Sequence, residues 1–292
     1  MAIEGPVGFV GIGIMGRGMA LNLTKAGRTL IVWNRDTTKA ESFAAEFGAT
    51  VAKTPKEVVE SCTLTYCMLS TLEADRAVFL GEEGVISGVS DGKCIVDCAT
   101  LTAEHMSEMS TLVTEKGGKF LEAPVSGSKA QAEGGVLIFL CGGDEELYNN
   151  IKEDLSAMGK ADFFFGAIGG GAKMKLVVNM VMGSIMNSLA EGVALCDASG
   201  LPVDKLLEVL DLGAMSSPII RGKGPNMLSG NHSPAFPLKH QQKDMRFAVA
   251  LGDELGLSLP VAAASNENFK RARPEFGDND FSAVYEVLKK KK

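Results

Sequence analysis

The sequence predicts an α/β protein in which a Rossmann-type, doubly wound sheet is followed by an all-helical domain. Up to about residue 167, short apolar runs alternate with helical patterns, which is typical of strands joined by crossover helices. Beyond the Gly169-Gly170-Gly171 run, patterns typical of strands almost vanish and helical patterns follow one another. We therefore expect residues 1–167 to form the α/β domain and residues 168–292 the helical domain.

The predicted strands of the first domain are short and apolar, so the sheet is expected to be parallel and covered on both faces. They span 6–11, 29–34, 63–69, 93–97, 119–123, 136–141 and 162–165. The intervening helices span 14–26, 37–47, 55–61, 73–80, 102–116 and 144–158. Local signals support several ends, since Gly27 follows the first helix, Thr38 and Glu41 have capping-box spacing, and Pro55 opens a helix.

The second domain should be organised around one long helix from about residue 172 to 199. This helix is rich in small and apolar residues, so we expect more than one of its faces to be buried, with part of it in a subunit interface. Further helices are predicted at 203–212, 239–256, 260–273 and 280–290. The stretch 215–237 is rich in Ser, Pro, Gly and Asn, which predicts a loop or short helical turns.

Composition excludes several classes of function. The chain has 292 residues and a net charge of −7, and its basic residues are dispersed, which does not fit a nucleic-acid-binding protein. No apolar run reaches the roughly 18 to 20 residues that span a bilayer. The first strand begins within a few residues of Met1, which leaves no room for a targeting peptide. We expect a cytoplasmic protein, with a trimmed plastid or mitochondrial form left open, and a solvated tail at Lys289–Lys292.

Cysteine and histidine use points away from metal chemistry. None of the six cysteines forms a Cys-x-x-Cys pair, so buried, reduced thiols are expected, with Cys98 the one candidate for a regulatory thiol. The three histidines show no metal-ligand spacing with cysteine or carboxylate residues, and no metal is predicted. Because histidine is scarce, the search for a general acid moves to lysine.

A glycine fingerprint follows the first predicted strand. It runs Gly11-Ile12-Gly13-Ile14-Met15-Gly16 and opens a helix. In such a turn Gly11 allows the tight bend, Gly13 lets the backbone approach a pyrophosphate, and Gly16 lets the helix pack closely on the strand. The helix N-terminus then offers free N–H groups to the anion. This context predicts a dinucleotide site that includes Ile14 and Met15.

The end of the second strand should decide which dinucleotide is bound. It carries Asn34 and Arg35, and a guanidinium at this position suits the 2′-phosphate of NADPH or NADP⁺. Asp36 follows directly and has two interpretations: an NAD-type carboxylate that reads a ribose hydroxyl, or the N-cap of the next helix. We favour NADPH.

Two later strand ends should also meet the cofactor, because ligands of such sheets lie at the carboxyl ends of the strands. Ser70 follows the strand at 63–69, and Thr100 follows the strand at 93–97. Thr100 has a second interpretation, as the capping hydroxyl of the helix at 102–116.

Catalytic candidates lie at the start of the long helix. Lys175 and Asn179 are four residues apart and share a face, whereas Lys173 points elsewhere. Burial lowers the pKa of a lysine, which would suit it to protonate an alkoxide. Taken alone, a lysine near a helix start is better interpreted as a surface residue.

A turn after the strand at 119–123 is the candidate for binding a carboxylate. Ser126-Gly127-Ser128 offers N–H groups and hydroxyls that could form an anion nest, or it is an ordinary turn. The mixed charges of Lys239-His240-Gln241-Gln242-Lys243-Asp244 are, by composition alone, a solvated helix face.

Together these motifs resemble the four blocks of the β-hydroxyacid dehydrogenases, in the order of that family and over essentially the whole chain. The blocks are the glycine fingerprint, Asp97-Cys98-Ala99-Thr100, Ala123-Pro124-Val125-Ser126-Gly127-Ser128, and Gly171-x-x-x-Lys175-x-x-x-Asn179 with Lys243-Asp244. The longer strings Phe236–Met245 and Lys173–Met180 resemble the plant-type glyoxylate/succinic semialdehyde reductases.

The resemblance implies NADPH-dependent reduction of glyoxylate to glycolate and of succinic semialdehyde to 4-hydroxybutyrate. It implies that Lys175 is the catalytic lysine with Asn179 beside it, and that the Ser126 turn binds the substrate carboxylate. Thr100 and Lys243 then match cofactor positions, and Phe236 and Asp244 match positions near the substrate. The chain departs from the family where Ala99 replaces a serine, which leaves Thr100 intact.

Two alternatives come with this expectation. The first is a 3-hydroxyisobutyrate dehydrogenase, which would prefer NAD, and Arg35 at the strand end argues against it. The second is a catalytically silent dehydrogenase-like module, which the presence of Lys175 disfavours. The expected partners are a small aldehyde-acid substrate and further copies of the chain, in a dimer or tetramer, with no nucleic acid and no membrane.

Overall fold

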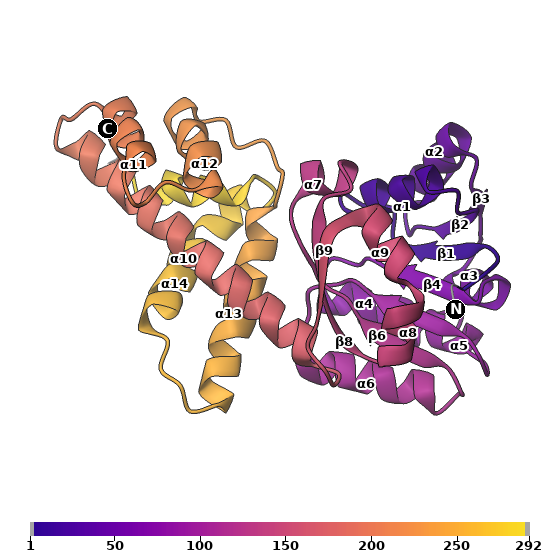
Figure 1. The fold of residues 1–292 in the computed structure, drawn as a ribbon. Helices are drawn as coiled ribbons and strands as arrows, with labels where there is room; N and C mark the ends of the chain where they lie inside the picture. Colours follow the sequence, from indigo (N-terminus) through magenta and orange to yellow (C-terminus); the bar gives the residue numbers. More distant parts are fainter. Residues whose placement is uncertain (1–2, 290–292) are drawn as a thin grey trace. The chain divides into compact units, whose positions relative to one another are not determined.

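The computed structural model describes residues 3–289, which form two compact units (Figure 1). The first unit is an α/β domain and the second is helical, which confirms the predicted fold class. Contacts divide the chain between Lys175 and Leu176, inside helix α10 (Gly170–Ala198), whereas the expected boundary was at residue 167. Residues 290–292 of the predicted solvated tail lie outside the described residues.

The sheet of the first unit has nine strands, with the order β3-β2-β1-β4-β5-β6-β8-β7 and β9 paired to β8. The strands are β1 (Val7–Val10), β2 (Leu30–Trp33), β3 (Thr50–Val51), β4 (Leu64–Cys67), β5 (Cys94–Asp97), β6 (Lys119–Glu122), β7 (Val125–Ser126), β8 (Leu137–Gly143) and β9 (Gly159–Phe164). The carboxyl ends of β1, β2, β4, β5 and β6 share one edge, because these strands are mutually parallel.

The expectation of a wholly parallel sheet was wrong for the part of the sheet that contains β8. Strand β8 runs antiparallel to both β6 and β7, and it is parallel only to β9. A parallel return needs a crossover of a dozen or more residues, usually a full helix. The chain between β6 and β8 holds only β7 and the five-residue helix α7 (Lys129–Glu133), so it turns back on itself.

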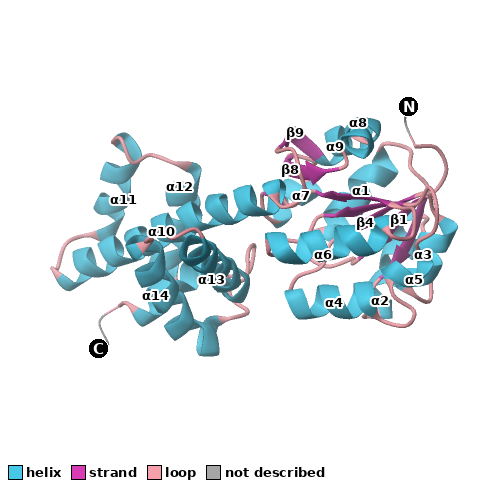
Figure 2. Cartoon of the chain, turned by 90° about the horizontal axis from the view of Figure 1, so that it is seen from below, coloured by secondary structure: helices cyan, strands magenta, loops and turns pink. Residues whose placement is uncertain are grey.

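Helices cover both faces of the sheet (Figure 2). One buried cluster joins the sheet to α1 (Gly16–Lys25), α2 (Thr37–Phe47), α7, α8 (Glu145–Asn150) and α9 (Lys152–Met158). A second cluster joins it to α3 (Pro55–Ser61), α4 (Leu72–Leu80), α5 (Val85–Gly88) and α6 (Ala103–Thr114). The double cover that the apolar strands predicted is therefore present.

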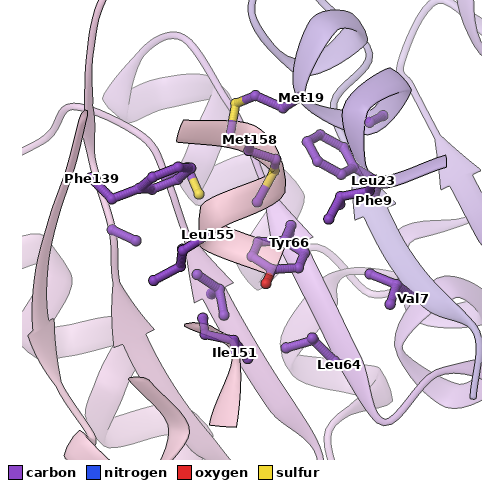
Figure 3. Packing of buried hydrophobic residues seen from close by; sticks show 14 of the residues in the cluster. Val7, Phe9, Met19, Leu23, Leu64, Tyr66, Phe139, Ile151, Leu155 and Met158 are labelled. Carbon is purple, nitrogen blue, oxygen red and sulfur yellow. The ribbon is translucent and has the colours of Figure 1, made fainter. Parts of the chain in front are cut away.

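The first cluster is a dense apolar core between β1, β4 and the helices α1 and α9 (Figure 3). Phe9 and Tyr66 stack with ring centroids 6.2 Å apart, and Leu23 and Met158 are fully buried against them. Burial of each such side chain contributes about 1.5 to 3 kcal/mol. This core holds the strand that precedes the glycine turn.

Several local predictions can now be corrected. The predicted helix 144–158 is broken at Ile151, which separates α8 from α9. Thr38 and Glu41 form no capping box, because Asp36 is the N-cap of α2 and Thr38 already lies inside the helix. Pro55 does open α3, and the preceding Thr54 caps it by accepting the N–H of Glu57.

The second unit is built from helices that pack around α10. They are α11 (Val203–Leu212), α12 (Pro218–Ser229), α13 (Leu238–Glu254), α14 (Pro260–Phe276) and the 3₁₀ helix η1 (Phe281–Val287). The buried side of α10 contributes Met186, Leu189 and Val193 to this core. The last predicted helix is thus a short 3₁₀ segment rather than an α-helix over 280–290.

Helix α12 lies within 215–237, where a loop or short helical turns were expected. Its sequence contains Gly222, Gly224 and Pro225, which disfavour helices in isolation. Packing reverses this preference, since a Cβ on Gly224 would lie 2.5 Å from Leu207 Cδ2. Glycine therefore lets α12 approach α11 closely, and burial of the neighbouring apolar residues compensates for the weak propensity.

One helix of the described residues, α10, is long and apolar enough to cross a membrane by length and composition alone. The expectation that no such run exists was wrong by this measure, because the Val, Met, Leu and Ala residues of α10 keep its mean hydropathy high although polar residues interrupt the run. This is weak evidence for a span, since core helices of soluble proteins pass the same test and this helix carries buried Asn179 and Asn187. All six cysteines are buried and unpaired, as predicted.

Candidate active site

The glycine turn has the shape that a dinucleotide requires. Gly11 has φ +103°, and a Cβ on it would lie 2.4 Å from the carbonyl oxygen of Met68. A Cβ on Gly16 would lie 1.9 Å from the carbonyl oxygen of Gly11. Gly13, in contrast, is exposed and has no atom within 4 Å of its Cβ position. The turn is thus packed tightly at both ends and open in the middle, where a pyrophosphate would approach.

The helix behind the turn can receive an anion. Helix α1 begins at Gly16, and the preceding residues Ile14 and Met15 have apolar side chains that offer no capping oxygen. The first N–H groups of α1 therefore lack a side-chain acceptor at the N-cap. A phosphate group fits such a helix N-terminus because it accepts these N–H groups and favours the positive end of the dipole.

Asn34 links the glycine turn to the end of β2. Its Oδ1 accepts the N–H of Ile12 at 2.9 Å, and its Nδ2 donates to the carbonyl oxygen of Asp36 at 2.9 Å. This side chain is therefore occupied in holding two loops together. Its role in the structure is to position the turn, a role that the sequence pattern did not specify.

Arg35 and Asp36 differ in what surrounds them. Arg35 is exposed, while Oδ1 of Asp36 accepts the hydroxyl of Thr38 at 2.6 Å and Oδ2 lies 3.7 Å from Lys39 Nζ. The Thr38 hydroxyl holds the pKa of Asp36 below its usual value. Asp36 occupies the N-cap position of α2 and its carboxylate is engaged locally.

The later strand ends place Ser70 and Thr100 at the carboxyl edge of the sheet. Ser70 is exposed after β4, and the neighbouring Thr71 caps α4 by accepting the N–H of Ala74. The cap of α6 is Thr102, which accepts the N–H of His105 at 3.3 Å. The interpretation of Thr100 as the cap of α6 is therefore wrong, and its cofactor-side role stays a prediction.

A buried acidic cluster, which no sequence motif predicted, supports the Thr100 loop. His105 Nε2 and Asp75 Oδ1 are 2.6 Å apart, and Asp97 Oδ1 accepts the N–H of Ala99 at 2.9 Å. Burial raises the pKa of Asp97 well above its usual value and lowers the pKa of His105. These residues come from α4, β5 and α6, so no local motif could reveal their contact.

The substrate-turn candidates occupy a strand end and a helix cap. Ser126 is half-buried in β7, and Gly127 is exposed with φ +135°. The N–H and the hydroxyl of Ser128 both bond to Oε1 of Gln131, at 2.9 and 2.7 Å. Ser128 is thus committed to capping α7, which leaves Ser126 and the backbone of Gly127 as the stronger candidates.

Helix α10 separates its two lysines as its periodicity predicted. Lys175 is 5% exposed, whereas Lys173 is exposed. Asn179, one turn further along, is 2% exposed. Burial of both Lys175 and Asn179 excludes the surface-lysine interpretation.

In the second unit, Asn179 belongs to a polar cluster that joins α10 to α13. Its Nδ2 donates to Asp244 Oδ2 at 2.6 Å, and its backbone carbonyl oxygen accepts a hydrogen bond from Nε2 of Gln241 at 2.9 Å. Lys243 Nζ lies 2.8 Å from Asp244 Oδ1. The 239–244 segment is therefore not a solvated face, since Gln241, Lys243 and Asp244 are all buried.

Phe236 is held in place by Asp280 and Phe281. Its N–H donates to Asp280 Oδ2 at 3.2 Å, and its ring meets that of Phe281 edge-on at 5.6 Å between centroids. Asp280 is fully buried and pairs with Lys223 Nζ at 2.7 Å. This anchor was not predicted, because its members are more than forty residues apart in sequence.

The structure thus gathers the predicted residues into local groups. Gly11, Gly13, Gly16 and Asn34 form the dinucleotide turn, and Asn179, Lys243 and Asp244 form one hydrogen-bonded cluster. In the described part of the chain, no group of three His, Cys, Asp or Glu side chains could hold a metal ion.

This fold, with its glycine turn and buried helical lysine, defines a nicotinamide-dinucleotide-dependent oxidoreductase. Two family models match the chain: the NAD-binding domain of 6-phosphogluconate dehydrogenase over residues 6–183, and the NAD-binding domain of NADP-dependent 3-hydroxyisobutyrate dehydrogenase over residues 169–288. The chain belongs to the β-hydroxyacid dehydrogenase family, as the sequence motifs predicted.

Individual relatives agree with this assignment. Glyoxylate/succinic semialdehyde reductase 1 of Arabidopsis thaliana is 50% identical over 97% of this chain and 98% of its own length. The cytokine-like nuclear factor N-PAC of Homo sapiens is 44% identical over 96% of this chain, which spans 50% of that protein. The structure of 3-hydroxyisobutyrate dehydrogenase from Mycobacterium tuberculosis aligns with a TM-score of 0.87 and 26% identity, covering 99% of this chain and all of that one.

Proposed function

We propose that this protein reduces small aldehyde acids with NADPH, converting glyoxylate to glycolate and succinic semialdehyde to 4-hydroxybutyrate. The observation that carries the proposal is the 50% identity to a glyoxylate/succinic semialdehyde reductase over nearly the full length of both chains. The buried Lys175 and Asn179 on α10 supply the polar groups that such a reaction needs.

The residues of the first unit fit the cofactor. Gly11, Gly13 and Gly16 would hold the pyrophosphate at the start of α1, and the exposed Arg35 guanidinium would bind the 2′-phosphate. Ser70 and Thr100 lie at the edge of the sheet where such ligands bind. When bound, NADPH supplies the hydride for the aldehyde carbon.

The chain itself must supply a proton and hold the substrate. Lys175 would donate a proton to the carbonyl oxygen, which becomes the hydroxyl of the product. Asn179 shares the lysine's helix face, and its hydrogen bond to Asp244 fixes its amide. Lys243 pairs with Asp244 and is the remaining cofactor-side candidate.

A small set of side-chain and backbone groups would orient the substrate. The Ser126 hydroxyl and the Gly127 N–H would bind the substrate carboxylate, with Ser128 setting the shape of the turn. Phe236, anchored through Asp280, would provide an apolar wall. A carboxylate requirement distinguishes aldehyde acids from simple aldehydes.

The test is NADPH oxidation by the purified protein, with glyoxylate and succinic semialdehyde measured side by side. Acetaldehyde serves as a control that lacks the carboxylate and should be turned over far more slowly. Activity with both acids supports the proposal, and their ratio gives the substrate preference. If neither acid supports NADPH oxidation, the proposal is overturned.

A second candidate is oxidation of 3-hydroxyisobutyrate, since one matching family model describes an NADP-dependent 3-hydroxyisobutyrate dehydrogenase. Steady-state rates with this acid and either NAD⁺ or NADP⁺ separate the two functions. A kcat/KM for 3-hydroxyisobutyrate above that for glyoxylate would favour the second candidate. A protein inactive with every substrate would instead fit a silent dehydrogenase-like module.

We further propose a cytoplasmic homo-oligomer, either a dimer or a tetramer. Support comes from apolar side chains that lie exposed along α10, where Val177, Val181 and Leu195 are 46%, 49% and 70% exposed. Light scattering after size exclusion measures the mass, and a monomer would contradict the proposed assembly. Cell fractionation tests the location.

A further inference from the structure

Glu122, the last residue of β6, reaches the first turn of helix α10. Its side chain is fully buried, and Oε1 accepts the N–H of Gly171 at 2.7 Å and of Ala172 at 3.3 Å. These N–H groups belong to the first turn of a 29-residue helix, where no helical carbonyl can accept them. A side chain from the sheet therefore does the work that an N-cap residue usually does within the helix.

Two glycines make room for this contact. Gly142 pairs with Glu122 across β6 and β8, and a Cβ on it would lie 2.6 Å from Glu122 Oε1. A Cβ on Gly171 would lie 2.1 Å from the carbonyl oxygen of Leu140. The first turn of α10 thus packs directly on the backbone of β8, with the Glu122 carboxyl filling the space beside it.

Lys175 lies one turn beyond this anchor. In an α-helix its N–H bonds to the carbonyl oxygen of Gly171, the residue whose own N–H Glu122 holds. A shift of the first turn would therefore displace the Lys175 backbone with it. Helix α8, in contrast, is capped locally by Asp144, which accepts the N–H of Leu147 at 2.7 Å.

The contact does not depend on the charge of Glu122. Burial raises the pKa of its carboxyl to about 7, against the opposing effect of the N–H groups of Ala172, Gly171 and Gly169. Asp97, the neighbour of Glu122 in the β5–β6 register, acts in the same direction. A protonated carboxyl still has a carbonyl oxygen that accepts hydrogen bonds, so the anchor persists in either protonation state.

From these contacts we infer that Glu122 is a positioning residue for catalysis: its Oε1 fixes the first turn of α10 and thereby the placement of Lys175. Nothing in the motif blocks of the family resemblance assigned it this role. The inference deepens the proposed function, because it rests on Lys175 as the proton donor. The hydrogen-bond acceptor, rather than the negative charge, carries the effect.

Three variants test the inference, with Asp144→Ala as the matched control. Glu122→Ala removes the acceptor, whereas Glu122→Gln keeps an acceptor oxygen and removes the charge. Gly142→Ala is the second route, because its methyl would push the Glu122 carboxyl away from the helix without removing it. Asp144→Ala deletes a helix cap of the same domain that does not touch α10.

The first measurement is hydrogen–deuterium exchange of the peptide 165–176. This measurement does not depend on whether the protein is enzymatically active. We expect faster exchange in Glu122→Ala and Gly142→Ala than in the wild type, Glu122→Gln or Asp144→Ala. Unchanged exchange in Glu122→Ala would overturn the inference. Should Glu122→Ala fail to fold, Gly142→Ala and Glu122→Gln give the same comparison. If the wild-type protein is inactive with every aldehyde, only the proposed function is contradicted. The hydrogen–deuterium exchange rates would still show whether Glu122 holds the start of α10.

The second measurement is steady-state kinetics with NADPH titration. Glu122→Ala should lower kcat about 100-fold, the loss typical of a reacting group displaced by about 1 Å, with little change in the Kd for NADPH. Glu122→Gln and Asp144→Ala should stay within about threefold of wild type. If Glu122→Ala keeps the full kcat, or if Glu122→Gln loses as much kcat as Glu122→Ala, the inference that the Glu122 acceptor oxygen positions Lys175 is contradicted.

Discussion

The side-chain amide of Asn179 donates a 2.6 Å hydrogen bond to Oδ2 of Asp244, which joins helix α10 to helix α13. Asn179 is 2% exposed and Asp244 is 1% exposed, so the bond forms away from solvent. Lys243 lies 2.8 Å from the other oxygen of the same carboxylate. Asp244 is therefore the centre of a buried cluster whose members depend on one another.

Removing that centre should destabilise the protein. Asp244→Ala leaves the Asn179 amide and the Lys243 ammonium buried without this acceptor, which typically costs about 3 to 5 kcal/mol. Urea denaturation measures the loss. Asp253→Ala, at an exposed position of the same helix, is the control and should change stability by less than about 0.5 kcal/mol. Equal stability in the two variants would mean that the cluster contributes little.

Lys175→Ala should nearly abolish turnover. Loss of a positioned proton donor typically lowers kcat by about 10²- to 10⁴-fold. NADPH binding, measured by fluorescence titration, should be largely retained, because the glycine turn is untouched. Lys173→Ala is the control, since Lys173 is exposed on the same helix. Retained activity in Lys175→Ala would remove this lysine from the mechanism.

Cofactor choice should follow Arg35 rather than Asp36. Arg35→Ala removes a charged partner of the 2′-phosphate, and hydrogen bonds to charged groups contribute about 1.5 to 3 kcal/mol. The KM for NADPH should therefore rise by about 10- to 100-fold, with the KM for NADH little changed.

Asp36→Ala separates the two interpretations of this strand end. Its carboxylate is already bonded to Thr38, so we expect only a small effect with either cofactor. A selective loss of NADH activity in this variant would show that Asp36 reads the ribose hydroxyl instead.

Glu122 should make stability fall as pH rises. Burial raises the pKa of its carboxyl from 4.5 to about 7, so between these values the folded state binds a proton more tightly than the unfolded state. Folding then loses up to about 3 kcal/mol across this window, because one pKa unit corresponds to about 1.4 kcal/mol. Glu122→Gln cannot titrate and should lack this loss. Denaturation midpoints of both proteins below pH 4.5 and above pH 7 test this, and parallel pH profiles would contradict it.

Much of the cofactor half was predictable from sequence because its signals are local. The glycine turn lies within six consecutive residues, and the helices α2 and α3 follow the predicted bounds. The catalytic candidates Lys175 and Asn179 share a helix, so periodicity alone places them on one face. Their roles and those of the other predicted site residues stay predictions.

The missed groups share a different property. Asp75, Asp97 and His105 meet from three elements, and Glu122 reaches Gly171 across 49 residues. Neither contact leaves a spacing pattern, because each depends on which strands become neighbours in the sheet. The same reason explains the antiparallel β8, whose direction follows from a connection too short for a crossover.

The sequence by itself determined that alternating strands and helices are followed by helices alone, and it determined the dinucleotide turn and the helix that carries Lys175, because periodicity, glycine and capping chemistry act within a few residues. Only the tertiary structure decided that Lys175 is buried, that Asp244 holds Asn179 and that Glu122 anchors the start of α10. These are properties of side chains removed from water, where each polar group needs a partner that only packing can bring to it.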